Sequence, residues 1–161
     1  MKKYLVIGNP IKHSLSPLIH NYWMKKYRLI DSVYEKRKVE EKDLENIVKE
    51  IRDDEIIGMN VTVPFKKLII PFLDELDIFA KNTQSVNTVK KVKNKIVGYN
   101  TDGLGFGQTI DDFYPQDSSM LESIDLILDG KNIFILGAGG VTPSIISTLE
   151  HKGGNIILSN R

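Results

Sequence analysis

Residues 132–141 read Asn-Ile-Phe-Ile-Leu-Gly-Ala-Gly-Gly-Val, an apolar run that ends in a cluster of glycines. The run Asn132–Leu136 predicts a strand, residues 137–140 a tight turn, and Val141–His151 a helix. A second apolar run at Asn155–Leu158 predicts another strand. A strand, a turn, a helix and a further strand in this order are typical of a βαβ unit, whose two strands are parallel.

The same alternation runs through the first hundred residues. Strands are predicted at Tyr4–Ile7, Val33–Lys38 and Ile56–Val61, with one helix beginning near Pro17 and another over Glu41–Arg52. The resulting order is βαβαβ. It predicts an α/β fold with a mostly parallel sheet.

Three further elements are predicted before residue 113. The segment 65–80 is expected to be helical with a break at Pro71, because proline removes a backbone donor and crowds the preceding turn. Two alternating stretches, Val86–Val92 and Lys95–Asn100, predict a hairpin. A helix is expected over Gly103–Asp112.

Two domains are predicted from this pattern, with Phe113–Ser119 as the linker because it combines Pro115 with several polar residues. Residues 1–113 would form a substrate-binding domain, and residues 114–161 the start of a Rossmann dinucleotide-binding unit. A sheet of two parallel strands leaves an open edge. We therefore expect the chain to stop inside its second domain, leaving that domain incomplete.

Composition excludes several classes of site. The 161 residues are 41% apolar and 27% charged, as in ordinary globular proteins, and include no cysteine that could form a disulfide, a thiolate metal site or a nucleophile. The histidines, His13, His20 and His151, are too scattered to predict a metal site. No apolar run reaches the roughly 18 residues of a membrane span. We expect a cytoplasmic protein without a membrane partner.

The net charge of +1 hides an asymmetry, because basic residues are in excess over residues 1–101 and acidic residues over 102–161. The lysines are interleaved with acidic residues and have no aromatic platform among them, so a nucleic-acid partner is not expected. Ordinary solvated helix faces explain this distribution.

The glycine cluster has the position of a phosphate-binding loop, where the backbone approaches a pyrophosphate at a helix N-terminus. A plain turn between strand and helix is the alternative, and Thr142 departs from the small residue expected in the fingerprint. After the second strand, where an NAD site would have an acid, the sequence has Asn160 and Arg161. A guanidinium can pair with a 2′-phosphate, which favours NADP. The predicted cofactor-binding residues are Gly137, Ala138, Gly139, Gly140, Val141, Asn160 and Arg161.

A second group of candidates lies in the first domain. Ser14 and Ser16 stand where a strand passes into a helix and could bind a carboxylate, although Ser16 could simply act as the N-cap of that helix. Asn60, Thr62 and Lys66 follow the third strand, at the edge where open α/β sheets bind ligands.

Two more polar motifs complete this group. Asn87 lies in Ser-Val-Asn-Thr and Asp102 in Asn-Thr-Asp-Gly, although the latter is also a common turn with a capping aspartate. Hydroxyls, amides, one ammonium and one carboxylate together suit a small polyhydroxylated acid.

The order of these motifs resembles the shikimate dehydrogenase family across the whole chain. The family reduces 3-dehydroshikimate to shikimate with NADPH in aromatic amino-acid biosynthesis. The resemblance implies that Ser14 and Ser16 hold the substrate carboxylate. It implies that Asn60, Thr62, Asn87 and Asp102 hold its hydroxyls, and that Lys66 is the catalytic acid/base paired with Asp102.

Alternatives remain at this point. A quinate/shikimate relative would share the motifs, and a non-catalytic module could keep the small-acid site without a working cofactor site. The resemblance also implies a longer chain in family members, whose additional part completes the nucleotide domain. The sequence predicts neither monomer nor homodimer.

Overall fold

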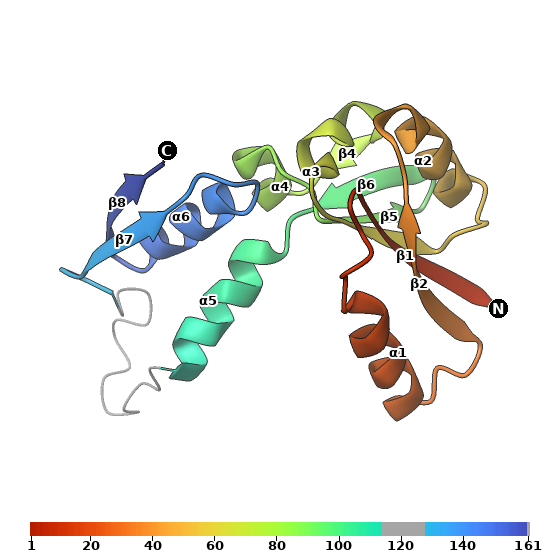
Figure 1. The fold of residues 1–161 in the computed structure, drawn as a ribbon, viewed down its shortest axis with the longest axis horizontal. Coiled ribbons are helices and arrows are strands. Elements are labelled where there is room, and N and C mark those ends of the chain that lie inside the picture. The colour runs from red at the N-terminus through yellow and green to blue at the C-terminus, as the bar shows by residue number, and fades with distance from the viewer. Residues whose placement is uncertain (114–127, 161) are drawn as a thin grey trace. The chain divides into compact units, whose positions relative to one another are not determined.

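The computed structural model describes residues 1–113 and 128–160. The chain divides into two compact units, Met1–Asn100 and Thr101–Arg161 (Figure 1). The expected linker, apart from Phe113, lies outside the described residues. The domain boundary after residue 113 stays a prediction, and in the contacts of the structure the helix before it groups with the second unit.

The first unit is built on a six-stranded sheet in the order β2-β1-β3-β5-β6-β4. β1 is parallel to β2 and β3, β4 is parallel to β6, and β5 is antiparallel to both β3 and β6. The predicted α/β class with a mostly parallel sheet is confirmed. The strands are β1 (Lys2–Gly8), β2 (Ser32–Lys38), β3 (Gly58–Val61), β4 (Glu75–Leu76), β5 (Thr88–Val92) and β6 (Lys95–Tyr99).

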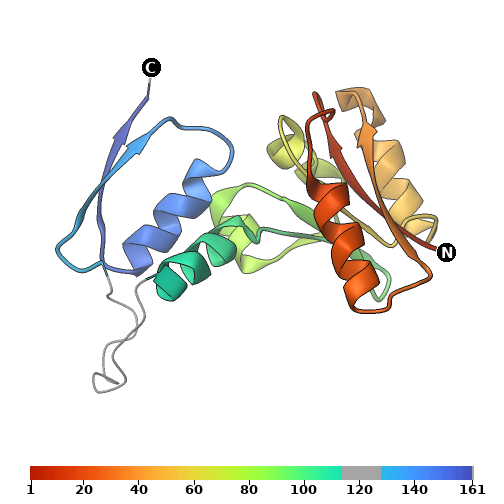
Figure 2. The same ribbon diagram turned by 60° about the horizontal axis from the view of Figure 1, so that its bottom comes forward.

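Helices cover this sheet unequally (Figure 2). Successive strand residues point to opposite faces, so Leu5 and Ile7 enter the main core while Val6 packs in a smaller cluster with Tyr34. The main core takes the apolar stripe of α2, which repeats at helical spacing: Leu44, Ile47, Val48 and Ile51. The helices are α1 (Ser16–Lys26), α2 (Leu44–Arg52), α3 (Phe65–Leu68) and α4 (Ile78–Thr83), with 3-10 turns at Glu41–Asp43 and Ile70–Phe72.

The helix predicted over residues 65–80 is wrong in its second half. Helical structure ends with the turn at Ile70–Phe72, and the chain then forms the short strand β4, whose Glu75 pairs with Val97. A new helix, α4, begins after Asp77, whose side chain caps it by accepting the backbone N–H of Ala80 at 2.8 Å. Pairing with a distant strand overrides local helical propensity here.

The second unit contains α5 (Asp102–Phe113), β7 (Asn132–Leu136), α6 (Thr142–His151) and β8 (Asn155–Ser159). β7 and β8 are parallel, in the register Asn132 to Asn155, so the predicted βαβ unit is confirmed. α5 lies against α6 because two of its glycines leave room. A Cβ on Gly103 would be 2.7 Å from Thr148 Oγ1, and one on Gly107 3.0 Å from Thr148 Cγ2.

Candidate active site

The ends of β1 and β3 are joined by backbone hydrogen bonds. The N–H of Thr62 donates to Ile7 O at 3.0 Å, and the N–H of Asn9 donates to Val63 O at 3.0 Å. A Cβ on Gly8 would lie 2.6 Å from Thr62 Cγ2, which is closer than packed atoms approach. Glycine at position 8 therefore allows Thr62 to lie against the end of β1.

Lys66 and Asn87 are held beside the same edge. Val86 N–H donates to Lys66 O at 2.8 Å, and Val61 N–H donates to Asn87 O at 2.9 Å. These bonds tie the start of α3 to the segment before β5, and that segment to β3. The structure thus brings Asn60, Thr62, Lys66 and Asn87 onto adjoining backbone segments, as the sequence predicts.

The Asn60 side chain forms the centre of a hydrogen-bond network. Its Oδ1 accepts a 2.6 Å hydrogen bond from the Tyr34 hydroxyl, and its Nδ2 donates to Asn87 O at 3.2 Å and to Thr88 Oγ1 at 3.0 Å. Thr88 Oγ1 in turn donates to Asn87 Oδ1 at 3.0 Å. Asn60 and Asn87, two predicted site residues, are therefore connected through Thr88, and Tyr34 anchors the Asn60 end of this network. The sequence did not indicate Tyr34 or Thr88.

Tyr34 lies beneath an aromatic layer and is only 4% exposed. The His20 ring stacks on its ring, with centroids 4.1 Å apart and planes 6° apart. Burial raises the pKa of the Tyr34 hydroxyl, which therefore stays protonated and able to donate at neutral pH. Burial lowers the pKa of His20, which favours the neutral imidazole in this position.

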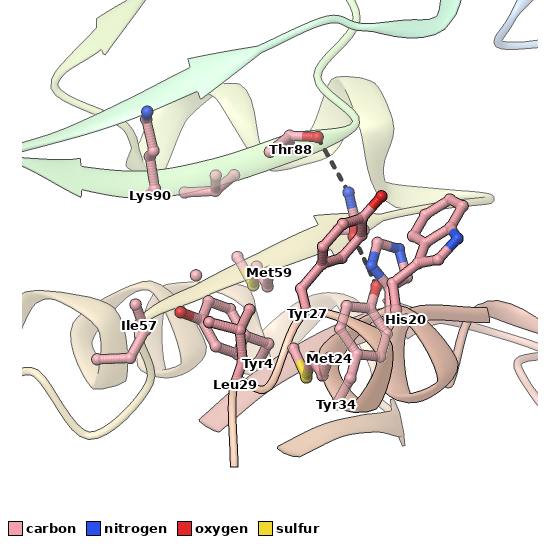
Figure 3. A pocket seen from close by; sticks show the side chains of 14 residues that line it. Tyr4, His20, Met24, Tyr27, Leu29, Tyr34, Ile57, Met59, Thr88 and Lys90 are labelled. Carbon is pink, nitrogen blue, oxygen red and sulfur yellow. Dashed lines mark hydrogen bonds between the residues drawn. The ribbon is translucent and has the colours of Figure 1, made fainter. Parts of the chain in front are cut away.

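Both rings line a cavity of about 500 Å³ on the α1 side of the sheet (Figure 3). Its walls are mostly apolar. Asn60 also lines the cavity and hydrogen-bonds to Tyr34 and Thr88, which are both labelled in Figure 3. The apolar lining residues include Tyr4, Trp23, Met24, Tyr27, Leu29 and Ile57.

Ser14 and Ser16 lie at the start of α1, as expected, and their carboxylate-binding role stays a prediction. Ser16 is the first helical residue, and the N-cap position belongs to Leu15. Ser14 Oγ accepts the backbone N–H of Ser16 at 3.3 Å. The alternative interpretation of Ser16 as the N-cap is wrong, because Ser14 supplies the oxygen that accepts an N–H at the helix start.

Ser14 lines a surface hollow that also contains Lys25, Lys36 and Glu35. Lys36 Nζ donates to Lys12 O at 2.6 Å, so its ammonium is held near the loop that carries Ser14. Two ammonium groups against one carboxylate favour an anion beside this serine.

The position of α1 depends on Asn21, another residue that the sequence reading missed. Asn21 Nδ2 donates to Tyr34 O at 2.8 Å, and Asn21 Oδ1 accepts Tyr34 N–H at 3.0 Å. Because β2 is an edge strand, this amide takes the place of a neighbouring strand and fixes α1 to the sheet. An asparagine within a helix carries no sequence signal for this role.

Asp102 is the first residue of α5, in the second unit, and is half-buried. A carboxylate in the first turn of a helix is stabilised by the N–H groups exposed there. The structure therefore gives Asp102 a defined local setting. Its pairing with Lys66 stays a prediction.

The glycine loop between β7 and α6 has an open backbone. Gly137 has φ +104°, a conformation that side chains disfavour, and its N–H donates to Ser159 O at 2.8 Å. Thr142 is buried and its hydroxyl donates to Gly137 O at 3.3 Å, so it braces the turn. A Cβ on Gly139 or Gly140 would meet no described atom within 4 Å.

These observations fit a dinucleotide phosphate. Nothing among the described residues requires glycine at positions 139 and 140, whereas close approach of a pyrophosphate does. Ala138 and Val141 are exposed beside them, and Asn160 follows the carboxyl end of β8. Arg161, the residue expected to favour NADP, lies outside the described residues.

Two other kinds of site find no support within residues 1–113 and 128–160. No helix there is long and apolar enough to cross a membrane. No group of three or more histidine, aspartate or glutamate side chains there is arranged to hold a metal ion.

Comparison with known proteins agrees with this geometry. Residues 6–89 match the family described as the shikimate dehydrogenase substrate binding domain. The chain is 50% identical over 161 residues to shikimate dehydrogenase (NADP(+)) of Pelagibacter ubique strain HTCC1062, covering 99% of this chain and 56% of that protein.

Solved structures show the same fold. A crystal structure of shikimate dehydrogenase in complex with NADP+ superposes with a TM-score of 0.85 at 36% identity, covering 100% of this chain and 52% of that one. Shikimate 5-dehydrogenase of Thermus thermophilus, in complex with NADP(H) and shikimate, gives a TM-score of 0.84 at 29% identity, covering 100% of this chain and 56% of that one.

The chain spans about half the length of the curated relatives it matches. The match to the family covers β1 to β5, the part of the chain that carries Asn60, Thr62, Lys66 and Asn87. The chain therefore belongs to the family of the shikimate dehydrogenase substrate binding domain.

Proposed function

We propose that this chain carries the shikimate site and the phosphate-binding loop of an NADP-dependent shikimate dehydrogenase, which interconverts 3-dehydroshikimate and shikimate in aromatic amino-acid biosynthesis. The observation that carries the proposal is that hydrogen bonds between adjoining segments bring Asn60, Thr62, Lys66 and Asn87 to the end of β3. The complex of the Thermus thermophilus relative with NADP(H) and shikimate supports the choice of ligands.

In this proposal the two serines at the start of α1 bind the substrate carboxylate. Lys25 and Lys36 add positive charge beside Ser14. Thr62, Asn87 and Asp102 bind the substrate hydroxyls. Asn60 also contributes, because an amide oxygen has two lone pairs and Oδ1 can accept a substrate hydroxyl besides that of Tyr34.

Lys66 is the proposed acid/base. When bound, NADPH supplies the hydride that reduces the substrate carbonyl. Negative charge then develops on the carbonyl oxygen, which the Lys66 ammonium stabilises and protonates. Asp102 is proposed to position this ammonium. In the reverse direction the neutral amine takes up the proton of the shikimate hydroxyl.

The chain's residues for NADP are those of the glycine loop and Asn160, with Arg161 proposed for the 2′-phosphate. The N–H groups at the start of α6 would face the pyrophosphate. Only small molecules are required as partners. We also propose a cytoplasmic location, because the reaction consumes NADPH for biosynthesis.

The test compares this chain with the full-length Pelagibacter ubique relative. Calorimetry measures shikimate binding to each protein, and nicotinamide absorbance follows shikimate-dependent reduction of NADP. The proposal requires shikimate binding by this chain. Binding without NADP reduction by this chain would make it a small-acid module, and an absence of binding would overturn the proposed function.

Lys66→Ala tests the proton donor in whichever protein turns over. The expected fall in kcat is about 100-fold or more, with a much smaller change in KM. Lys67→Ala is the matched control, because Lys67 is the exposed neighbour on the same short helix. A raised KM with unchanged kcat would reduce Lys66 to a binding group.

A further inference from the structure

The hydrogen bonds around Asn60 have a fixed direction. Tyr34 has a single hydroxyl proton and uses it toward Asn60 Oδ1. The Asn60 amide must then present its Nδ2 to Thr88 Oγ1, which accepts at 3.0 Å. Since the threonine oxygen accepts that hydrogen bond, its own proton remains for Asn87 Oδ1.

The last step of this sequence determines how the Asn87 amide is turned. With Oδ1 accepting the hydrogen bond of the Thr88 hydroxyl, Nδ2 lies within the same amide plane on the other side of Cγ, away from Thr88. The Asn87 amide therefore turns its donor end away from Thr88. A rotated amide would turn an N–H group toward Thr88 Oγ1 and leave the threonine proton without this acceptor.

Burial makes this arrangement rigid. Tyr34 is packed under the His20 ring, and Asn21 holds its backbone from α1. The raised pKa of Tyr34 keeps its proton in place. Partly buried hydrogen bonds of this kind exchange poorly with water, so each member constrains the next.

We propose that Tyr34 and Thr88 are positioning residues that orient the Asn87 amide for the substrate hydroxyl, through the relay Tyr34–Asn60–Thr88–Asn87. This inference rests on the proposed function, because it assigns to Asn87 a donor role toward shikimate. Neither Tyr34 nor Thr88 has to contact the ligand. Their effect passes through Asn87.

The first test uses shikimate affinity of this chain, measured by calorimetry. Thr88→Val keeps the shape of the side chain but removes its hydroxyl, and we expect affinity to fall about 5- to 10-fold. Thr88→Ser keeps the hydroxyl and should restore affinity to within about twofold of the original chain. Tyr34→Phe acts one step further away and should cost about 3- to 5-fold. Tyr99→Phe, opposite Thr88 in β6, is the control.

A mutant cycle separates positioning from general damage. In an Asn87→Ala background, Thr88→Val and Tyr34→Phe should cause no further loss of affinity, because the residue through which they act is gone. Equal losses in both backgrounds would overturn the relay. So would wild-type affinity in Thr88→Val.

A second measurement does not depend on ligand binding. In nuclear magnetic resonance spectra of the chain, Tyr34→Phe should shift the side-chain amide signals of both Asn60 and Asn87, whereas Tyr99→Phe should leave them in place. Absence of shikimate binding by the original chain would defeat the proposed function. An Asn87 signal unchanged by Tyr34→Phe and by Thr88→Val would defeat the relay, whatever the chain binds.

Discussion

The two candidate sites of this chain present different chemical groups to a ligand. At the end of β3, polar side chains are tied to one another before any ligand is present, through Tyr34, Asn60 and Thr88. In the loop after β7, the glycines leave the backbone uncovered. A Cβ added at Gly139 or Gly140 would have no described atom within 4 Å. One site is built from side-chain groups, and the other from exposed backbone.

Under the proposed function, the difference follows from what each ligand needs. A small acid with several hydroxyls is recognised by donors and acceptors at fixed positions, which requires side chains held in place. A pyrophosphate is recognised by backbone N–H groups at a helix start, which requires that nothing stand in front of them. Substitutions should therefore damage the two sites by different routes.

The largest effect is expected in the core that supports the first site. Ile51 is fully buried in α2, and Ile51→Ala should lower the free energy of unfolding of the first unit by about 2–5 kcal/mol, because it leaves a cavity. Amide hydrogen exchange measures the stability of each unit separately. Loss of protection in β1 and β3, with α6 unchanged, would show that the units unfold separately. Equal loss in both would remove the distinction between the two units.

Next is the contact between α5 and α6. Gly103→Ala places a methyl group 3.0 Å from Ser144 O and should cost about 1–3 kcal/mol by urea denaturation. Gly105→Ala on the same helix meets nothing within 4 Å and should raise stability by about 0.5–1 kcal/mol. A destabilising Gly105→Ala would mean that position 105 is packed against other atoms rather than open, contrary to this expectation.

Two glycines of the loop between β7 and α6 are expected to have different roles, one in ligand access and one in backbone conformation. Gly139→Ala should leave the melting temperature nearly unchanged yet weaken NADP binding about 10-fold or more, because the added methyl occupies space that the phosphate approaches. Gly137→Ala should instead lower stability by about 1–3 kcal/mol, since φ is +104°. Thermal melts and NADP titrations of both variants distinguish the two roles. Unaltered NADP affinity in Gly139→Ala would argue against this loop as the phosphate site.

The smallest effect is a dependence of stability on pH. Burial holds the pKa of His20 below its unfolded value of about 6.5, so the unfolded chain binds the proton more tightly. His20 therefore contributes fully to the free energy of unfolding above about pH 6.5, and this contribution declines as the pH falls below that value.

The melting temperature should thus fall between about pH 7.5 and 5.5, and fall less in His20→Gln. His13→Gln provides the matched control, because His13 is exposed in the loop before α1. If the melting temperature depends on pH equally in His20→Gln and in the original chain, His20 is ruled out as the source of that dependence.

Local sequence patterns predict much of this molecule. β7, α6 and β8 lie within one residue of their predicted bounds, because each apolar run ends at a glycine cluster or a polar turn that no packing has to override. The βαβαβ order of residues 1–61 is confirmed for the same reason. The placement of Asn60, Thr62, Lys66 and Asn87 on adjoining segments follows from their positions at strand ends.

Long-range pairing defeats such patterns. β4 exists because Glu75 and Leu76 pair with Val97 and Gly98, about twenty positions away, and no local period records that. Ser16 looked like an N-cap because it precedes a proline, but the oxygen at the helix start comes from Ser14. Tyr34 reads as one apolar position in a strand, and nothing near it in the sequence indicates Asn60 as its partner.

Periodicity and short motifs are sufficient to establish the α/β class and the identity of the chemical groups, since these depend on residues close together in the chain. Which of those groups hold one another follows from the tertiary fold alone. Hydrogen bonds with Tyr34 in β2 and Thr88 in β5 orient the Asn60 amide in β3. They form only because the folded sheet brings residues 26 and 28 positions apart within hydrogen-bonding distance. Which group donates and which accepts depends on the groups that are neighbours in space, and the order of residues along the chain does not show those neighbours.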